Sequence, residues 1–318
     1  MDIAAAPQPE RSGRRVTFGA AAVLAGFLLL APPLFVLAPL ILLSLASRPR
    51  SVREWFWLVA AAAGAWLALQ GASGNLALEL IRNSALVLAG CFLLLSLPAP
   101  GPSFARGLGA LLLTALAISG WEWSRGVGWP ELLRALTSLL QDSYRALLAP
   151  TGSPAPPNPD VKAFLQPLLD AAPDIARVFP GLLALEGLAG LALAWGWSHR
   201  LAVRPLGHPP APFRQFRFND HLVWVAIFTL AGLLAPFPAP WKALAANLLV
   251  LAVGLYATRG LAIVAAVLAP APGPLKLLAG LLAIVLFPLA LGLWLALGLA
   301  DTWLDIRGRL ASLASGGS

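Results

Sequence analysis

Apolar runs recur along the whole chain and are separated by short polar gaps. A helix needs roughly 20 apolar residues to cross a bilayer, and about 17 are sometimes enough. The runs therefore predict an all-α, polytopic transmembrane bundle of about 8–10 crossing segments. The clear runs cover 55–70, 76–98, 104–120, 180–197, 221–235, 241–257, 260–269 and 275–299.

Two stretches admit more than one interpretation. The stretch 16–46 is apolar but contains Pro32-Pro33, and two consecutive prolines disfavour a continuous helix. It is either one kinked helix or a pair of short ones, and we favour two crossings. The stretch 241–269 is interrupted by Thr258-Arg259-Gly260. It is either one long helix or a span and a half-helix, and we interpret Arg259 as part of a loop rather than as a residue facing a cavity.

A polar segment at 121–179 divides the apolar runs into two blocks. Its leucines recur at helical spacing while charged residues occupy the other positions, which indicates an amphipathic helix on the membrane surface. The domain organisation that follows is an N-terminal tail at 1–15, a first transmembrane block at 16–120, the excursion at 121–179, a second block at 180–300, and a C-terminal tail at 301–318.

Composition agrees with a bilayer location. The 318-residue chain is 59% hydrophobic and 11% charged, whereas soluble domains carry about 25% charged residues. The formal net charge is +8, but the positive residues lie in gaps between apolar runs, so membrane topology explains them better than nucleic-acid binding. Tryptophans near the run ends fit interfacial belts. They are Trp55, Trp57, Trp121, Trp195, Trp197, Trp241 and Trp303.

The arginines also predict an orientation, because cytoplasmic loops carry an excess of Lys and Arg. Arginine-rich gaps at 48–53 and 199–220 fall on the same side as the N-terminus, and the uncharged gaps at 71–75 and 236–240 fall on the other. We therefore expect a bacterial inner-membrane protein with both termini in the cytoplasm and the 121–179 excursion outside.

Four polar residues within the apolar runs are candidates for binding a small solute, because such groups are costly at bilayer depth. Glu79 and Arg82 are three residues apart, and a structural ion pair is the alternative explanation. Glu186 has no basic neighbour on its own helix, and Arg82 is a possible partner for it. Asn247 can instead bridge two helices.

Other charged residues point to contacts with lipid or a partner protein. Arg200, Arg204, Arg214 and Arg217 lie on one proline-rich loop. Asp301 and Asp305 share a helix face near the C-terminus, but no nearby histidine or third acid completes a metal site. We expect no metal and no cofactor.

Motifs for the common enzymatic mechanisms are missing from the sequence. It contains no Gly-x-x-x-x-Gly-Lys-Ser/Thr phosphate loop, no His-Glu-x-x-His and no Gly-x-Ser-x-Gly. We therefore expect a protein that is not an enzyme and that depends on a partner for energy.

The C-terminal third contains short patterns that suggest a family. They are Phe216-Arg217-Phe218, Arg259-Gly260-Leu261-Ala262, and Gly298-Leu299-Ala300-Asp301 followed by Asp305-Ile306-Arg307. With the overall size and the polar insert, they resemble the YybS-like family of bacterial predicted membrane proteins. That family is of unknown function and is distantly similar to the substrate-binding components of energy-coupling-factor transporters. The resemblance marks Gly298, Asp301, Asp305 and Arg307 as a family-like C-terminal motif and implies a separate ATPase partner.

Two functional hypotheses follow. The first is a transport-related membrane protein that binds a small solute among its helices. The alternative is a non-catalytic membrane scaffold or assembly factor, which would hold partners through the 199–220 loop and the outer amphipathic helix.

Overall fold

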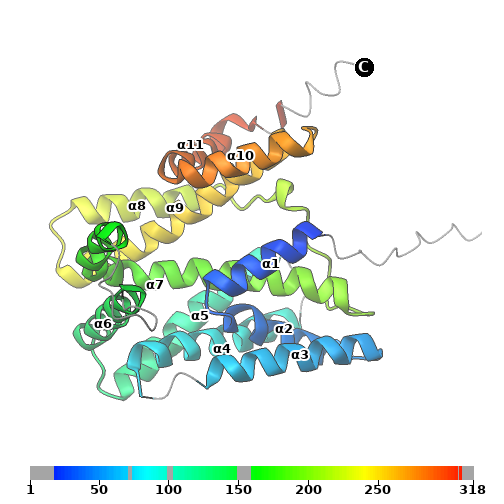
Figure 1. Cartoon of the computed structure of the whole chain (residues 1–318), viewed down its shortest axis with the longest axis horizontal. Helices are drawn as coiled ribbons and strands as arrows, with labels where there is room; N and C mark the ends of the chain where they lie inside the picture. The colour runs from blue at the N-terminus through cyan, green and yellow to red at the C-terminus, as the bar shows by residue number, and fades with distance from the viewer. Residues whose placement is uncertain (1–17, 71–73, 99–102, 149–158, 307, 310–318) are drawn as a thin grey trace, which may run out of the picture. The chain divides into compact units, whose positions relative to one another are not determined.

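The computed structural model describes residues 18–70, 74–98, 103–148, 159–306 and 308–309 (Figure 1). Over these residues the chain forms eleven α-helices, one 3-10 turn and no strand, so the predicted all-α fold class is confirmed. The elements are α1 (Phe18–Leu30), α2 (Leu34–Ala46), α3 (Val52–Leu69), α4 (Leu76–Ser96), α5 (Ser103–Ser124), α6 (Trp129–Leu148), α7 (Pro159–Leu201), η1 (Phe213–Gln215), α8 (Leu222–Leu234), α9 (Ala239–Val267), α10 (Gly273–Val285) and α11 (Phe287–Leu304).

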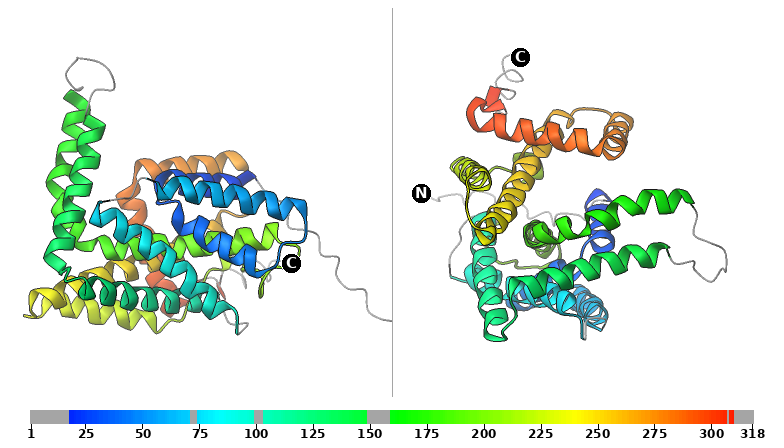
Figure 2. Two further views of the ribbon diagram at one scale, coloured as in Figure 1. Left: turned by 90° about the horizontal axis from the view of Figure 1, so that it is seen from below. Right: turned by 90° about the vertical axis from the view of Figure 1, so that its left-hand side faces the viewer.

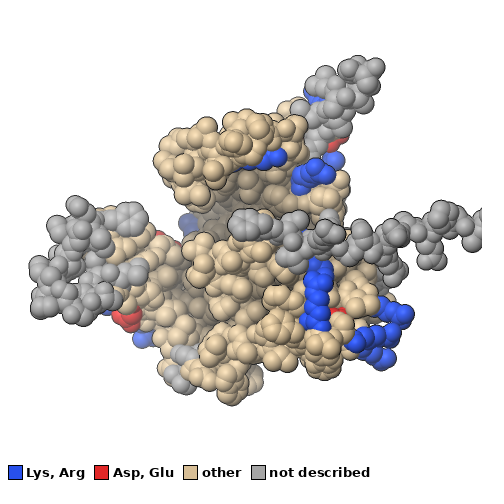
Figure 3. Space-filling model, turned by 45° about the vertical axis from the view of Figure 1, so that its right-hand side comes forward, with Lys and Arg blue, Asp and Glu red and all other residues tan. Residues whose placement is uncertain are grey.

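Six of the described helices are long and apolar enough to cross a membrane: α3, α4, α5, the Leu165–Leu201 part of α7, α9 and α11. Four more, α1, α2, α8 and α10, are apolar but shorter. Large uncharged areas cover the face in Figure 3, and Lys and Arg gather in a few patches. These features confirm a polytopic helical membrane protein, while the number of crossings stays a prediction.

The structure resolves the two ambiguous stretches. Residues 18–46 form two short helices, α1 and α2, with Pro33 at the start of α2. In contrast, α9 runs without a break through Thr258-Arg259-Gly260, so the interpretation of Arg259 as a loop residue is wrong. Arg is a good helix former and a single glycine costs only about 1 kcal/mol in a helix, which neighbouring contacts can offset.

The last apolar run was expected to be one helix, and that expectation is also wrong. Residues 275–299 are divided between α10 and α11, with Leu286 at φ −102° and ψ 37° between them. Pro288 lies in the first turn of α11, where its ring would clash with a preceding helical turn. The runs 241–257 and 260–269 thus form one long helix, and the run 275–299 forms a helical pair.

The polar segment contains the expected amphipathic helix. In α6 the charged pairs Glu131–Arg134 and Asp142–Arg145 are exposed, while Leu136 is completely buried. The following polar residues do not form a separate short helix, because α7 continues from Pro159 to Leu201. The helix α6 and the first part of α7 run side by side (Figure 2).

The described residues form two compact units. Unit 1 is drawn from Met1–Ser73, Ile81–Ile118 and Gly187–Pro210. Its core contains α2 packed against α7, because Gly187 and Gly190 leave space that Phe35 and Leu88 occupy. Small residues at these two positions therefore permit a close helix approach.

One buried carboxylate organises the end of unit 1 where α3 begins. Glu54 closes a capping box with Ser51 and also accepts a hydrogen bond from the N–H of Val203 at 2.7 Å. The start of α3 and the segment after α7 therefore lie together, as the predicted topology requires for two arginine-rich gaps on the same side.

Unit 2 is drawn from Gly74–Leu80, Ser119–Glu186 and Ala211–Ser318, and α9 is its central element. The helix is about 43 Å long at 1.5 Å per residue. It packs against α8 and α11 (Figure 1) and meets the first part of α7 at Gly181 and Leu185. These contacts place the candidate site described next.

Candidate functional site: a buried charge network

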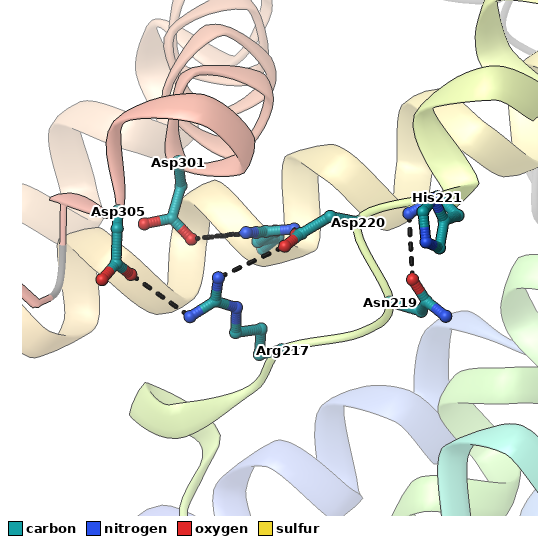
Figure 4. A network of polar contacts seen from close by, with 7 residues as sticks. Arg217, Asn219, Asp220, His221, Asp301 and Asp305 are labelled. Atoms are coloured by element: carbon teal, nitrogen blue, oxygen red, sulfur yellow. Dashed lines mark hydrogen bonds and ion pairs between the residues drawn. The ribbon is translucent and has the colours of Figure 1, made fainter.

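A network of five ionisable side chains lies in unit 2, where α9 meets α11 and the segment before α8 (Figure 4). We call it the charge network, and it comprises Arg217, Asp220, Arg259, Asp301 and Asp305. It contains three carboxylates and two guanidiniums, so among these five side chains the negative charges outnumber the positive ones by one.

Arg259 is the centre of the charge network. It is 0% exposed, and its Nε donates to Oδ2 of Asp301 at 2.9 Å. Its Nη1 donates to Oδ1 of Asp220 at 2.6 Å. Asp301 is itself 1% exposed, so this pair is shielded from water and depends on mutual neutralisation.

Arg217 forms the outer edge of the charge network. Its Nη2 lies 3.3 Å from Oδ2 of Asp220, and its Nη1 lies 3.2 Å from Oδ1 of Asp305. The side chains of Arg217 and Asp305 are about half exposed. The network therefore runs from an enclosed pair to an accessible one.

Aromatic rings shield the enclosed pair. The Arg259 guanidinium lies 5.4 Å from the ring centre of Phe218, and Phe218 packs edge-on against Tyr256 at 5.1 Å. A guanidinium over an aromatic face gains a cation–π interaction. The ring contacts thus fix Arg259 between its two carboxylates.

Two glycines allow α9 and α11 to approach closely enough for the central ion pair. A Cβ atom on Gly260 would clash with the backbone of Trp294, and one on Gly298 would clash with the backbone of Tyr256. The arrangement is reciprocal, since each helix presents a glycine to the carbonyl of the other. This close crossing places Asp301 beside Arg259.

The depth of the charge network can be gauged along α9. The rise from Trp241 to Arg259 is about 27 Å, close to the roughly 30 Å of a hydrocarbon core. If Trp241 lies at one interface, Arg259 lies near the other. Asp220 lies just before the start of α8 and Asp301 lies in the last turn of α11, which agrees with a position near a bilayer boundary.

Neighbouring charges also lower the pKa of Asp220, which lies before α8 and outside the candidate spans. Burial alone would raise the pKa of the Asp220 carboxyl, but hydrogen bonds and charges from Arg259 and Arg217 outweigh it and hold the pKa below its ordinary value of 3.8. A carboxylate with a lowered folded-state pKa stabilises the fold above its unfolded pKa, and that stability is lost as pH falls through the folded value.

Replacing Asp220 by asparagine is therefore expected to lower the thermal unfolding midpoint in detergent at neutral pH. The difference from the wild type should begin to shrink below about pH 3.8, where the unfolded-state carboxyl takes up a proton, and should disappear below the lowered pKa of the folded state. Thermal melts between pH 3 and pH 7 measure this. Asp174→Asn, at an exposed pair with Arg177, is the matched control and should show little difference at any pH.

The four solute candidates lie elsewhere and differ in their surroundings. Glu79 is 3.8 Å from Arg125, which also lies 3.8 Å from Glu122. Arg82 and Glu186 are half-buried, and neither forms a hydrogen bond or ion pair among the described residues. A partnership between them, and the binding of a solute by any of the four, stay predictions.

Asn247 bridges α9 and α7, as its helix-bridging alternative predicted. Its Oδ1 accepts from the N–H of Gly181 at 2.7 Å, and its Nδ2 donates to the carbonyl of Arg177 at 2.9 Å. These are the two groups that a regular helix would pair with each other. Pro180 lies between them within α7, so the Asn247 amide supports a distorted turn.

Replacing Asn247 by leucine should cost about 2 kcal/mol, because the Gly181 N–H and the Arg177 carbonyl would lose their partner. The cost should fall in a Pro180→Ala background, since α7 could then restore its own hydrogen bond. Unfolding titrations of the two single variants and the double variant measure this coupling. Equal costs in both backgrounds would contradict the bridging role.

The arginine candidates have separate environments. Arg200 lies over the ring of Trp197 at 5.6 Å, and Arg217 belongs to the charge network. Arg204 and Arg214 are exposed, and Arg214 lies in η1. A lipid or partner contact by these arginines is untested.

Three of the four motif residues are brought together at the charge network. Gly298 forms the helix crossing, Asp301 pairs with Arg259, and Asp305 pairs with Arg217. Arg307 lies outside the described residues. Within the described part of the chain, no group of histidines, cysteines and acids is placed to hold a metal ion.

Sequence reasoning missed Asp220 and the pairing of Arg259. The signal was present: Arg259 interrupts one apolar run, Asp301 closely follows another and carries the opposite charge, and Asp220 directly precedes a third. A rule that pairs isolated opposite charges at equivalent depths would have found the buried pair.

The fold and this enclosed network define a multi-pass helical membrane protein with ionisable groups between its helices. The chain belongs to the family described as "Predicted membrane protein (DUF2232)", whose profile matches residues 19–302. No curated protein and no solved structure gives a significant match.

Proposed function

We propose that the protein is a transport-related component of the bacterial inner membrane that binds a small charged solute among its helices and depends on a partner for energy. The charge network carries the proposal. Ionisable groups are costly within a bilayer and commonly mark the paths of solutes, ions or protons. Here five of them gather where α9 crosses α11.

The accessible side of the network suggests how a solute would bind. Arg217 is half exposed and lies on a segment outside the helices, and it shares Asp220 with the enclosed Arg259. A solute with a cationic group would take the place of Arg217 on Asp220, while the Arg259–Asp301 pair holds the Asp220 carboxylate in its binding position.

The proposed energy source is a separate ATPase. We also propose that the protein is related to the YybS-like family and distantly similar to energy-coupling-factor components. The proposed function includes no catalytic step and no cofactor. Exposed Arg204 and Arg214 on the proline-rich segment 199–220 are the proposed contacts for lipid or the partner.

Both termini are proposed to lie in the cytoplasm. For the C-terminal end, support comes from the Arg217–Asp305 ion pair, which joins the segment before α8 to the end of α11. Reporter fusions after residues 208 and 318 should both report a cytoplasmic location. A fusion after residue 208 that reports the outside would overturn the orientation.

A scaffold role is the second candidate. The Asn247 bridge and the close glycine crossing both fix helices in place, and such rigidity suits a protein that holds partners. A scaffold role, unlike solute binding, requires no exchange of ion pairs in the charge network.

Native mass spectrometry of the gently extracted protein tests the proposal. The spectrum of the wild type should show an additional bound mass, from a small molecule or from an ATPase. In Asp220→Asn, the fraction of protein that carries the small molecule should be lower. Arg145→Gln, at an exposed pair on α6, should leave it unchanged. A wild type without either mass, or identical spectra for all three proteins, favours the scaffold.

A further inference from the structure

Arg106, in the first turn of α5, is an arginine with unsatisfied donors inside unit 1. Its Nε and Nη1 atoms are buried and have no hydrogen-bond partner among the described residues. Arginine keeps its charge at every physiological pH, and all its nitrogens are donors. Leaving such donors without an acceptor costs more than leaving neutral ones, so the site calls for an acceptor.

The guanidinium is held in place by an aromatic platform. It lies 4.8 Å from the ring centre of Trp195 on α7, and Trp195 also packs edge-on against Phe92 of α4. The indole N–H of Trp195 donates to the carbonyl of His208 at 3.2 Å. Trp195 was expected at a lipid interface, but it is 1% exposed and so serves as a rigid support.

A second unsatisfied group lies against the same platform. The ring of His199 is 4.8 Å from that of Trp195, and its Nδ1 lies 2.9 Å from the Trp195 carbonyl. This carbonyl accepts from Nδ1–H, so in the neutral ring Nε2 carries the lone pair, and it donates to an anion only as imidazolium. Nε2 is buried without a partner among the described residues, as is Oγ of Ser96 at the end of α4.

The charge balance of unit 1 favours an anion. Its described residues contain seven arginines and one acid, Glu54. Both Glu54 oxygens already accept hydrogen bonds, from the backbone of Arg50, Ser51 and Val203 and from the Ser51 hydroxyl. Among the described residues of this unit, no carboxylate is therefore left to neutralise Arg106.

From these observations we propose that Arg106, supported by Trp195 and His199, binds the phosphate group of a phosphate ester, carried by an anionic phospholipid headgroup or by a soluble molecule. Phosphate oxygens accept paired hydrogen bonds from the guanidinium edge while one face stacks on an aromatic ring. Arg106 lies in the first turn of a helix that spans about 33 Å, which places it at headgroup depth.

Lipid binding by the full-length protein in non-ionic detergent tests this. Native mass spectrometry would follow titration with phosphatidylglycerol or phosphatidylcholine. Wild type should bind phosphatidylglycerol, and Arg106→Gln should weaken that binding about tenfold or more, as loss of a charged hydrogen bond implies. Arg53→Gln, at an exposed arginine of the same unit, should bind like the wild type.

Inorganic phosphate distinguishes the two sources. If millimolar phosphate raises the melting temperature of the wild type but not of Arg106→Gln, the ligand is a soluble phosphate ester. If phosphate has no effect and phosphatidylglycerol binding depends on Arg106, the ligand is a lipid headgroup. Equal phosphatidylglycerol binding by all three proteins, with no stabilisation by phosphate, would overturn the proposal.

Circular dichroism and gel filtration check that Arg106→Gln folds. If it does not, Arg106→Lys provides the test, because lysine keeps the charge but loses the planar fork and the stacking. Phosphatidylglycerol affinity should then fall several-fold, and an unchanged affinity would count against the site.

Discussion

Replacing Arg259 by leucine is expected to destabilise the protein by about 3–5 kcal/mol, the usual cost of removing one partner from a buried ion pair. The loss would leave the carboxylate of Asp301, only 1% exposed, without its guanidinium. Asp220 would lose the same partner but is half exposed and keeps Arg217. Reversible unfolding in mixed micelles measures the change.

The double variant Arg259→Met with Asp301→Leu separates pairing from packing. Replacing both members of a buried pair by apolar residues of similar size is often neutral or stabilising. The double variant should therefore be more stable than Arg259→Leu alone. If the double variant loses as much free energy of unfolding as the two single variants lose together, the two residues act independently.

The second large effect is expected at the crossing of α9 and α11. Gly260→Ala or Gly298→Ala would place a methyl group against the backbone of Trp294 or Tyr256. A backbone cannot move away as a flexible side chain can, so each change should cost at least about 2 kcal/mol. It should also weaken the Arg259–Asp301 pair, because the helices must separate.

Gly292→Ala on α11 is the matched control, because a Cβ atom there meets nothing within 4 Å. Alanine is favoured over glycine in a helix by about 1 kcal/mol, so this variant should be neutral or slightly more stable. Unfolding titrations of the three variants should show a lower free energy of unfolding for Gly260→Ala and Gly298→Ala. They should show an unchanged or slightly higher free energy of unfolding for Gly292→Ala. A destabilised Gly292→Ala would point to a general intolerance of α11 to change.

Much of the fold is predictable from local sequence, because the bilayer forces apolar runs to be helical. The break at Pro32-Pro33 follows from proline chemistry alone and was expected as an alternative. The continuity of α9 through Arg259 does not follow in this way. It depends on a carboxylate 42 residues later in the chain, and a local pattern cannot contain that information.

The site is less predictable for the same reason. Each solute candidate was chosen because a polar residue inside an apolar run is costly. Asn247 shows that hydrogen bonds to a neighbouring helix can offset this cost without any solute. Arg259 was passed over because it was assigned to a loop. Gly260 and Gly298, which lie 38 residues apart in sequence, form one crossing only in the folded chain.

The charge network is proposed to bind a solute and not only to hold α9 and α11 together. The Arg259→Met, Asp301→Leu double variant tests this proposal most directly, since its fold is expected to survive without the buried charges. Native mass spectrometry of this variant, extracted in parallel with the wild type, compares their bound masses. We expect the double variant to fold and to have lost the small molecule that the wild type binds. A folded double variant that retains that molecule would contradict the proposal.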